Sequence, residues 1–312
     1  MSLANIEAWL LRLALPDTTA APDLPTLSAT EFAQLGQLAR QHGVLPAVVM
    51  NAAKLTTHNV STLQESLLAP AALAITLRLR LAPILRALQE HDVPAVVLRG
   101  PDFADRLYPQ PGLRLFTDLD ILVSRAQLDA AGEALRALGY QLQQIKDLKH
   151  TDPYGEQLWK HPGHGIEQVE IHWNLVNSPA LQRRVSVEMD DLQFETGARR
   201  LTAASLLLIA TVHGATSHSF DRLQILCDIR QIAHLGVDAD QLAAVCQRTG
   251  STFSVVTGLR LAEHTFNDDA CRRLPQRFPP VLPLLTPRVV LRSGTTPNKL
   301  RRQLFRELLK RR

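Results

Sequence analysis

The sequence predicts an α+β fold in which a small sheet lies between two helical regions. Leu and Ala are abundant and aromatic residues make up only 5% of the 312 residues, a composition that favours helix over strand. Apolar residues recur at helical spacing in residues 1–90 and again in residues 179–312. Between them, in residues 91–178, short apolar and β-branched runs are separated by turn residues, as in strands. We therefore expect three domains with these boundaries.

The N-terminal region is expected to be helical. Ser28 and Glu31 have the spacing of a capping box, in which each side chain accepts a hydrogen bond from the other residue's backbone N–H. A longer helical pattern begins at Ser61. We expect it to bend at Pro70 or Pro83, because proline removes a helix hydrogen bond.

No membrane-spanning segment is expected. A spanning helix needs about 20 consecutive apolar residues, and the best candidate, Ala69–Leu85, contains two arginines and two prolines. Residues 1–16 lack the basic start and the uninterrupted apolar run of a secretory signal. The three cysteines form no C-x-x-C pair, which favours reduced thiols. We therefore expect a cytoplasmic protein without a membrane partner.

The central region contains the strands. Four short runs are expected to form them: Val93–Leu98, Asp118–Val123, Tyr140–Ile145 and Val169–Trp173. Helices are expected over Pro101–Tyr108, where proline suits the first turn, and over Ala126–Leu138, which Gly139 ends. The segment before Val169 is rich in Gly, Pro and His and is interpreted as a loop.

The C-terminal region returns to helical spacing. Four helices are expected, over Ala203–His213, Phe220–His234, Asp238–Arg248 and Phe253–Phe266, and a basic helix ends the chain. Residues 272–312 contain twelve Lys or Arg and one acid, a local charge of +11 that leaves −7 on the rest of a chain whose net charge is +4. The favoured interpretation of this tail is a solvated helix, and the alternative is a segment that binds nucleic acid or another polyanion.

Two carboxylates on the second expected strand give the strongest indication of chemistry. Alternate side chains of a strand share a face, so Asp118 and Asp120 point the same way. Carboxylates about 7 Å apart along a strand repel each other, and a divalent cation removes that penalty. A D-x-D pair alone is weak evidence, but this one lies in an apolar strand, which is an unfavourable place for acids without a ligand.

The fourth expected strand repeats the pattern. Glu170 and His172 share one face, and the apolar residues that alternate with them share the other. If this strand lies beside the second, Glu170 joins the two aspartates. Three carboxylates on adjacent strands can hold two metal ions, the arrangement that serves phosphoryl and nucleotidyl transfer.

Arg99 and Gly100 end the first expected strand. A glycine there allows backbone N–H groups to approach a phosphate, and the arginine adds a charge-assisted contact. A plain turn is the alternative interpretation of the glycine. Asp228 is suited to a cap, a salt bridge or a place in the cleft, and the sequence does not choose among them.

The histidines do not predict a zinc site. His150, His161, His164 and His172 match no common zinc spacing, and no cysteine lies among them. His213 and His218 are five residues apart, which does not align them on one face of an α-helix. From the spacing alone, a buried histidine with a hydrogen-bond partner is the favoured interpretation of His213.

In combination these motifs resemble the uncharacterised bacterial nucleotidyltransferase family, which belongs to the polymerase-beta-like superfamily. The resemblance covers roughly residues 80–235 and rests on the ordered motifs R-G, Y-P, G-L-R, D-L-D-I-L-V, V-E-I-H-W and H-G. It implies a small mixed-sheet nucleotidyltransferase core. The implied reaction moves a nucleoside monophosphate from a nucleoside triphosphate to a hydroxyl-type acceptor, which is a small molecule, sugar, peptide or protein. The implied cofactor is Mg²⁺, with Mn²⁺ as the alternative.

Position by position, the resemblance implies roles for eight residues. The catalytic metal ligands are Asp118, Asp120 and Glu170; the nucleotide-binding residues are Arg99, Gly100 and Arg114; the supporting residues are His172 and His213. The chain departs from the superfamily pattern at Pro101, where a serine usually follows the glycine, and in a longer interval between Gly100 and Asp118.

Two alternatives to an active enzyme follow from these features. The departure at Pro101 favours a catalytically weakened nucleotide-binding or regulatory homologue. The second alternative is a nucleic-acid-binding protein that acts through the basic tail, whose binding should fall steeply with salt and vanish when residues 297–312 are removed. The enzyme interpretation predicts instead that this truncation leaves nucleotide binding largely intact.

Overall fold

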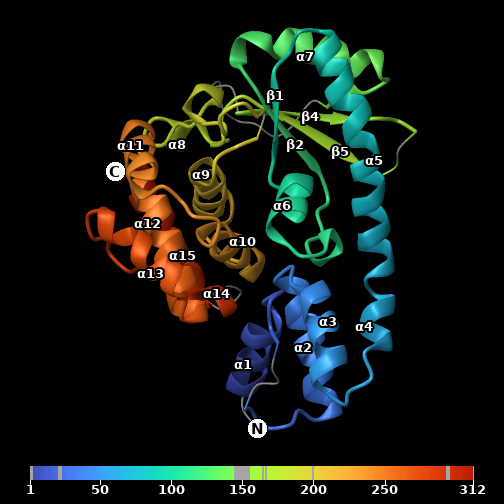
Figure 1. The fold of residues 1–312 in the computed structure, drawn as a ribbon, viewed down its shortest axis with the longest axis vertical. Helices are drawn as coiled ribbons and strands as arrows, with labels where there is room; N and C mark the ends of the chain where they lie inside the picture. The colour runs from blue at the N-terminus through green and yellow to red at the C-terminus, as the bar shows by residue number, and fades with distance from the viewer. Residues whose placement is uncertain are drawn as a thin grey trace.

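A computed structural model describes residues 3–19, 23–143, 155–163, 165, 167–198, 200–292 and 296–311. Within these residues, helices surround one five-stranded sheet, which confirms the α+β class (Figure 1). The domain boundaries at residues 90 and 178 remain a prediction. All five strands lie between them.

The N-terminal helices form one end of the molecule, except that the last and longest of them runs away from that end (Figure 1). They are α1 (Leu3–Leu13), α2 (Ala29–Gln41), α3 (Leu45–Leu55), α4 (Ser61–Glu65) and α5 (Leu68–Glu90). The capping box of Ser28 and Glu31 is confirmed at the start of α2. The helix expected from Ser61 is interrupted between α4 and α5, before Pro70 is reached, and Pro83 lies inside α5.

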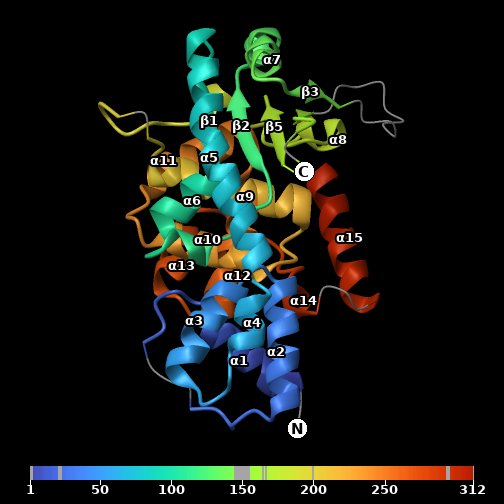
Figure 2. The same ribbon diagram turned by 90° about the vertical axis from the view of Figure 1, so that its right-hand side faces the viewer.

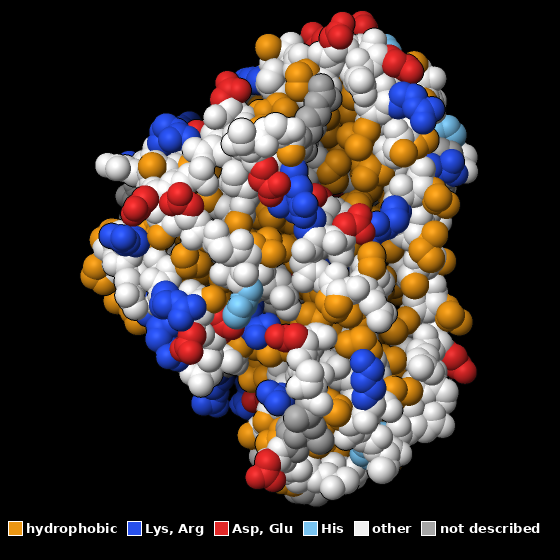
Figure 3. Space-filling view, viewed as in Figure 1, with side chains coloured by type: hydrophobic (Ala, Val, Ile, Leu, Met, Phe, Trp, Pro, Cys, Tyr) orange, Lys and Arg blue, Asp and Glu red, His pale blue; other side chains and the backbone are white. Residues whose placement is uncertain are grey.

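Helix α5 runs from this end along the sheet towards α7 (Leu128–Ala137). Leu77, Ile84 and Leu88 are buried on its inner side. Its outer side exposes Leu68, Ile75 and Leu79, and Figure 3 shows hydrophobic side chains along the edge where α5 runs.

The stretch Ser61–Glu90 is long and apolar enough to cross a membrane, by length and composition only. The expectation that no stretch approaches this length is therefore wrong, because an 18-residue window within it remains apolar enough although the stretch contains arginines and prolines. A buried core helix or a signal sequence passes the same test. The absence of a membrane partner remains a prediction.

The sheet has the strand order β1-β2-β5-β4-β3. Its strands are β1 (Ala95–Leu98), β2 (Leu119–Val123), β3 (Gln141–Leu142), β4 (Glu156–Lys160) and β5 (Gln168–His172). Strands β2 and β5 are parallel and the other pairs are antiparallel, so the sheet is mixed. In the β2–β5 register Asp120 lies opposite Glu170, as the sequence pattern required.

Strand β4 lies in the segment that sequence analysis interpreted as a loop. Three of its five residues, Glu156, Gln157 and Lys160, are polar residues with little strand preference, and only Trp159 is fully buried. Strand β3 is shorter than expected; residues 144 and 145 of that prediction lie outside the described part of the chain.

The sheet separates two hydrophobic cores. Leu119, Ile121 and Ile171 face a core that they share with α5 and α7. Leu98 and Leu122 face the larger core, which contains α6 (Gly100–Leu107) and side chains of both helical regions. Because side chains alternate along a strand, Asp120 shares its face with Leu122 and is turned towards these helices.

The C-terminal helices cover this second face (Figure 2). They are α8 (Pro179–Gln182), α9 (Ala203–His213), the π-helical turn η4 (Gly214–His218), α10 (Leu223–Ala233), α11 (Ala239–Thr249), α12 (Thr252–Phe266), α13 (Asp269–Arg273), α14 (Pro287–Leu291) and α15 (Thr296–Arg311). The four helices expected between residues 203 and 266 and the final basic helix are confirmed, with ends shifted by up to three residues.

Candidate active site

A cavity of about 550 Å³ lies between the sheet and the helices. All eight residues that sequence analysis proposed for the site line it: Arg99, Gly100, Arg114, Asp118, Asp120, Glu170, His172 and His213. They come from the end of β1, the loop before β2, β2 itself, β5 and the end of α9. The fold therefore brings together residues from across the central and C-terminal regions.

Burial and mutual repulsion set the charge of the two aspartates. Asp118 lies one residue before β2, and burial followed by the negative charges of Asp120 and Glu170 raises the pKa of Asp118 to about 7. Burial acts on Asp120 in the same direction. There the positive charges of Arg99 and His172 outweigh burial, so the pKa of Asp120 lies below its usual range.

His172 is held among carboxylates. Its Nε2 atom donates to Asp120 Oδ1 at 3.0 Å and lies 3.6 Å from Glu170 Oε2. Its Nδ1 atom lies 3.5 Å from Glu156 Oε2, an ion-pair distance. Burial lowers the pKa of His172, but these carboxylates outweigh burial and raise that pKa to about 10. His172 is therefore an imidazolium near pH 7, and it positions Asp120.

Glu156 is a site residue that sequence analysis missed. It lies on β4 opposite His172, it lines the cavity, and Asn177 donates a hydrogen bond to it. Burial raises its pKa. Strand alternation across β4 would have indicated it, but β4 itself was interpreted as a loop.

The donor set fits a divalent cation. Carboxylate oxygens of Asp120 and Glu170 lie within 4.8 Å of each other and of a His172 ring nitrogen, and Asp118, outside this group, lines the same cavity. Because the His172 ring is protonated, it donates to Asp120 and is not itself a ligand. Carboxylate oxygens are the ligands that Mg²⁺ and Mn²⁺ prefer. Burial raises the pKa of Asp118, and the negative charges of Asp120 and Glu170 raise it further against the opposing charges of Arg99 and His172. A cation at this place would remove that repulsion.

Arg99 turns the chain from β1 into α6 in a strained conformation. Its φ of 51° and ψ of −119° are a combination that glycine adopts readily and other residues rarely, at a cost of about 1–3 kcal/mol. Its Nη2 atom donates to Asp120 Oδ2 at 2.7 Å. Pro101 lies in the first turn of α6, where a missing N–H breaks no helix hydrogen bond.

His213 and His218 lie together on the opposite wall, with ring centroids 4.7 Å apart. The expectation that a five-residue spacing separates them is wrong, because the turn between them is π-helical and closes over five residues. His213 lines the cavity, and burial followed by the charges of Arg99 and His218 holds its pKa well below the usual range. It is therefore neutral near pH 7.

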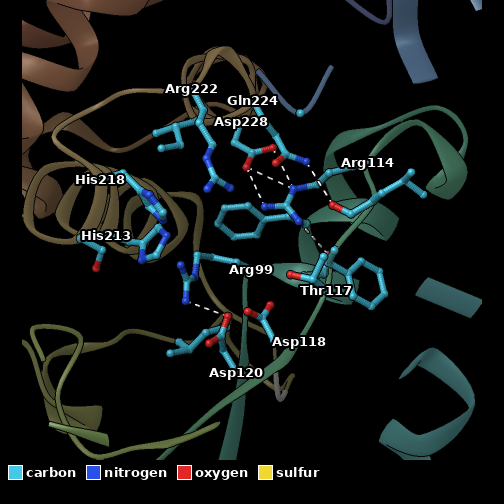
Figure 4. A pocket seen from close by; sticks show the side chains of 18 of the residues that line it. Arg99, Arg114, Thr117, Asp118, Asp120, His213, His218, Arg222, Gln224 and Asp228 are labelled. Atoms are coloured by element: carbon cyan, nitrogen blue, oxygen red, sulfur yellow. Dashed lines mark hydrogen bonds and ion pairs between the residues drawn. The ribbon is translucent and has the colours of Figure 1, made fainter. Parts of the chain in front are cut away.

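The two walls have opposite character (Figure 4). Arg222, His213 and His218 lie on the side away from Asp118 and Asp120, and Arg99 lies between the two groups with its guanidinium paired to Asp120. We call these two arginines and two histidines the cationic wall, after the charge of the arginines. Sequence analysis missed Arg222 as a site residue, because it belongs to no motif and precedes α10. The cavity therefore pairs a carboxylate group with a cationic wall.

A family model described as an uncharacterised nucleotidyltransferase matches residues 28–267. The chain belongs to this nucleotidyltransferase family. Comparisons with curated proteins and with solved structures give no match. The matched residues extend well beyond the sheet. They include the segment of the C-terminal region that contains His213, His218 and Arg222.

In this nucleotidyltransferase Arg114 has a structural partner. Its Nε and Nη2 atoms donate to the Asp228 carboxylate at 2.8–3.1 Å, and its Nη1 atom donates to the Gly100 carbonyl at 3.3 Å. Tyr108 donates to the same carboxylate at 2.7 Å. Asp228 is thus both a salt-bridge partner and a cavity residue. A direct contact of Arg114 with nucleotide remains a prediction, and the geometry gives it a role in fixing Gly100.

The π-helical turn of the nucleotidyltransferase depends on a glycine. A Cβ atom at Gly214 would lie 2.7 Å from both Ile225 and Phe220. We expect Gly214→Ala to destabilise the protein by about 1–3 kcal/mol through overpacking, measured by urea unfolding. Gly112→Ala is the control, because the described residues leave open space around that position. Equal stability of the two variants would contradict the conclusion that the packing around Gly214 leaves no room for a Cβ atom.

Proposed function

We propose that the protein is a metal-dependent nucleotidyltransferase that moves a nucleoside monophosphate from a nucleoside triphosphate to a hydroxyl-type acceptor. The observation that carries the proposal is a cavity lined both by Asp118, Asp120 and Glu170 and by the cationic wall, in a chain of the nucleotidyltransferase family. Its volume of about 550 Å³ lies in the range of small-molecule sites, roughly 300–1,000 Å³.

Asp118, Asp120 and Glu170 would hold Mg²⁺ or Mn²⁺. When bound, the metal supplies positive charge at the α-phosphate and at the departing pyrophosphate. His172 keeps Asp120 ionised and oriented through the hydrogen bond to Oδ1. Loss of such a support around a ligand commonly lowers metal affinity about 10–100-fold.

The cationic wall is proposed to bind the triphosphate. Arg99 and Arg222 carry positive charge, and the neutral rings of His213 and His218 can each donate one N–H to a phosphate oxygen. The pair of Arg99 and Asp120 neutralises part of the carboxylate charge in the nucleotide-free protein. Arg99 would exchange this partner for phosphate when nucleotide and metal enter together.

Glu170 is proposed to orient the acceptor hydroxyl. Its side chain is 24% exposed, whereas that of Asp120 is 7% exposed, so an acceptor reaches Glu170 more easily. A carboxylate in this position can accept the hydroxyl proton as the new phosphate ester forms.

Isothermal titration with each nucleoside triphosphate, with and without Mg²⁺, tests the proposal. We expect Mg²⁺-dependent binding by the wild type and a loss of at least about tenfold in Asp118→Asn and in Glu170→Gln, because each removes a charged oxygen donor. Asp129→Asn, at an exposed position on α7, is the control. Unchanged binding in both site variants would refute the metal assignment. No binding by the wild type would refute the proposed enzyme and favour a regulatory homologue that has lost the nucleotide site.

A further inference from the structure

The basic C-terminal helix packs directly behind the cationic wall. Phe305 of α15 is fully buried, with its ring 6.0 Å from that of Phe220 and 5.3 Å from that of Phe253. Leu309 is also buried. The helix is therefore anchored in the main core by one face, and the interpretation of the tail as a solvated helix holds only for the other face.

Two arginines of α15 bind the backbone of the π-helical turn. Arg302 Nη2 donates to the His218 carbonyl at 2.7 Å and to Asp221 Oδ2 at 3.0 Å. Arg306 Nε donates to Ser219 Oγ at 2.8 Å, and its Nη2 donates to the Ser217 carbonyl at 3.4 Å. These carbonyls lie at the end of the turn, where helix carbonyls lack partners within the helix.

The turn needs such support. Ser219 and Phe220 follow it with φ values of 49° and 53°, two successive non-glycine residues in the left-handed region. Conformations of this kind cost about 1–3 kcal/mol each and persist when the surroundings fix them. The Phe220 N–H closes the turn on the Gly214 carbonyl, and Phe305 covers the Phe220 ring.

We propose that Arg302 and Arg306 are positioning residues for the nucleotide site. They hold η4 in the wide turn that places His213 and His218 side by side on the cationic wall. The part of this inference that concerns nucleotide rests on the proposed function, whereas the part that concerns the histidines does not. Two positively charged residues of the basic tail thus stabilise a wall of the cavity from its outer side.

This packing conflicts with the expectation that removal of residues 297–312 leaves nucleotide binding intact. The truncation removes Phe305 and Leu309 from the core and both arginines from the turn. A loss of nucleotide binding on truncation therefore does not identify α15 as a nucleic-acid-binding segment, and point variants are needed.

The test compares two double variants of the full chain that remove the same charge from the same helix. Arg302→Ala with Arg306→Ala breaks the contacts to the turn. Lys299→Ala with Arg301→Ala removes two exposed cations and is the control. Arg302→Lys with Arg306→Lys keeps charge and one donor at each position, so it covers the case in which the alanine variant fails to fold.

The first measurement needs no nucleotide. In ¹⁵N spectra of the histidine rings, assigned with His213→Gln and His218→Gln, we expect the His213 and His218 signals to shift or broaden in the alanine variant. We expect little change in the control and a partial return in the lysine variant. Ring signals that match the wild type in a folded alanine variant would overturn the proposal, as would an equal change in the control.

The second measurement is the dissociation constant of the Mg²⁺ nucleoside triphosphate that the wild type binds most tightly. We expect about a tenfold or larger increase in the alanine variant and less than about threefold in the control, one factor of ten being 1.4 kcal/mol. If the wild type binds none of them, the proposed function fails, and the histidine spectra still decide this inference.

Discussion

Asparagine at Asp120 is expected to destabilise the metal-free protein by about 3–5 kcal/mol, whereas asparagine at Asp118 is expected to stabilise it by about 2 kcal/mol at pH 8. The Asp120 carboxylate compensates the buried positive charges of Arg99 and His172. Its replacement by an amide leaves these two charges without that compensation. Burial disfavours the negative charge of Asp118, and Asp120 and Glu170 repel it, so an uncharged side chain removes both penalties. A tenfold change in proton affinity corresponds to about 1.4 kcal/mol, and solvent screening of this partly exposed side chain reduces the effect to about 2 kcal/mol.

The stability contributions of Asp118 and His172 depend on pH over different ranges. The pKa of Asp118 is raised by folding to about 7, so its contribution to the free energy of unfolding is present below about pH 4 and is lost as the pH rises towards 7. The pKa of His172 is also raised, to about 10, and its contribution is lost between about pH 6.5 and 10. The stabilisation by Asp118→Asn should therefore be small at pH 4 and reach its full size near pH 8.

Urea unfolding of the metal-free protein at pH 5 and pH 8 measures the change in the free energy of unfolding for each of the two variants. Asp129→Asn should change the free energy of unfolding by less than about 0.5 kcal/mol, as an exposed residue outside the cavity. If Asp118→Asn and Asp120→Asn changed the free energy of unfolding in the same direction, the opposite electrostatic surroundings assigned to the two carboxylates would be wrong.

Replacing Asp228 with alanine is the other change with a large expected effect, a destabilisation of about 3–5 kcal/mol. The substitution leaves the Arg114 guanidinium buried without its carboxylate and removes the acceptor of the Tyr108 hydroxyl. Because Arg114 also donates to the Gly100 carbonyl, we expect the turn after β1 to lose order together with the salt bridge.

A double-mutant cycle distinguishes a lost attraction from an uncompensated charge. Arg114→Met with Asp228→Leu removes both charges and replaces them with apolar side chains, and should cost much less than the sum of the single variants. Thermal and urea unfolding of Arg114→Met, Asp228→Leu and the double variant give the coupling energy. Additive costs would contradict the view that the pair acts as one buried unit.

The carboxylate group could be predicted because strand periodicity carries it. Asp118 and Asp120 alternate with core residues, and Glu170 does the same on β5, so the shared face follows from a repeat of two. Their meeting required only that β2 and β5 be neighbours, and the register pairs Asp120 with Glu170. The amphipathic helices were predictable for the corresponding reason, with a repeat of 3.6.

The rest of the site depends on features without a local signal. The proximity of His213 and His218 results from a π-helical turn, which a pattern based on the α-helical repeat assigns wrongly. Glu156 was missed because β4 is polar and lies between glycine- and proline-rich segments. The partner of Arg114 lies 114 residues away in the chain, and only the packed structure selects it.

The parallel pairing of β2 with β5 has a consequence for the order of folding. Parallel strands cannot be joined by a tight hairpin, and here α7, β3 and β4 intervene, so 52 residues separate His172 from Asp120. Closing such a loop costs chain entropy before any contact between the strands offsets it. We expect refolding chains to regain helical circular dichroism well before they regain the paired carboxylates, so the competence to bind metal should be among the last properties to return.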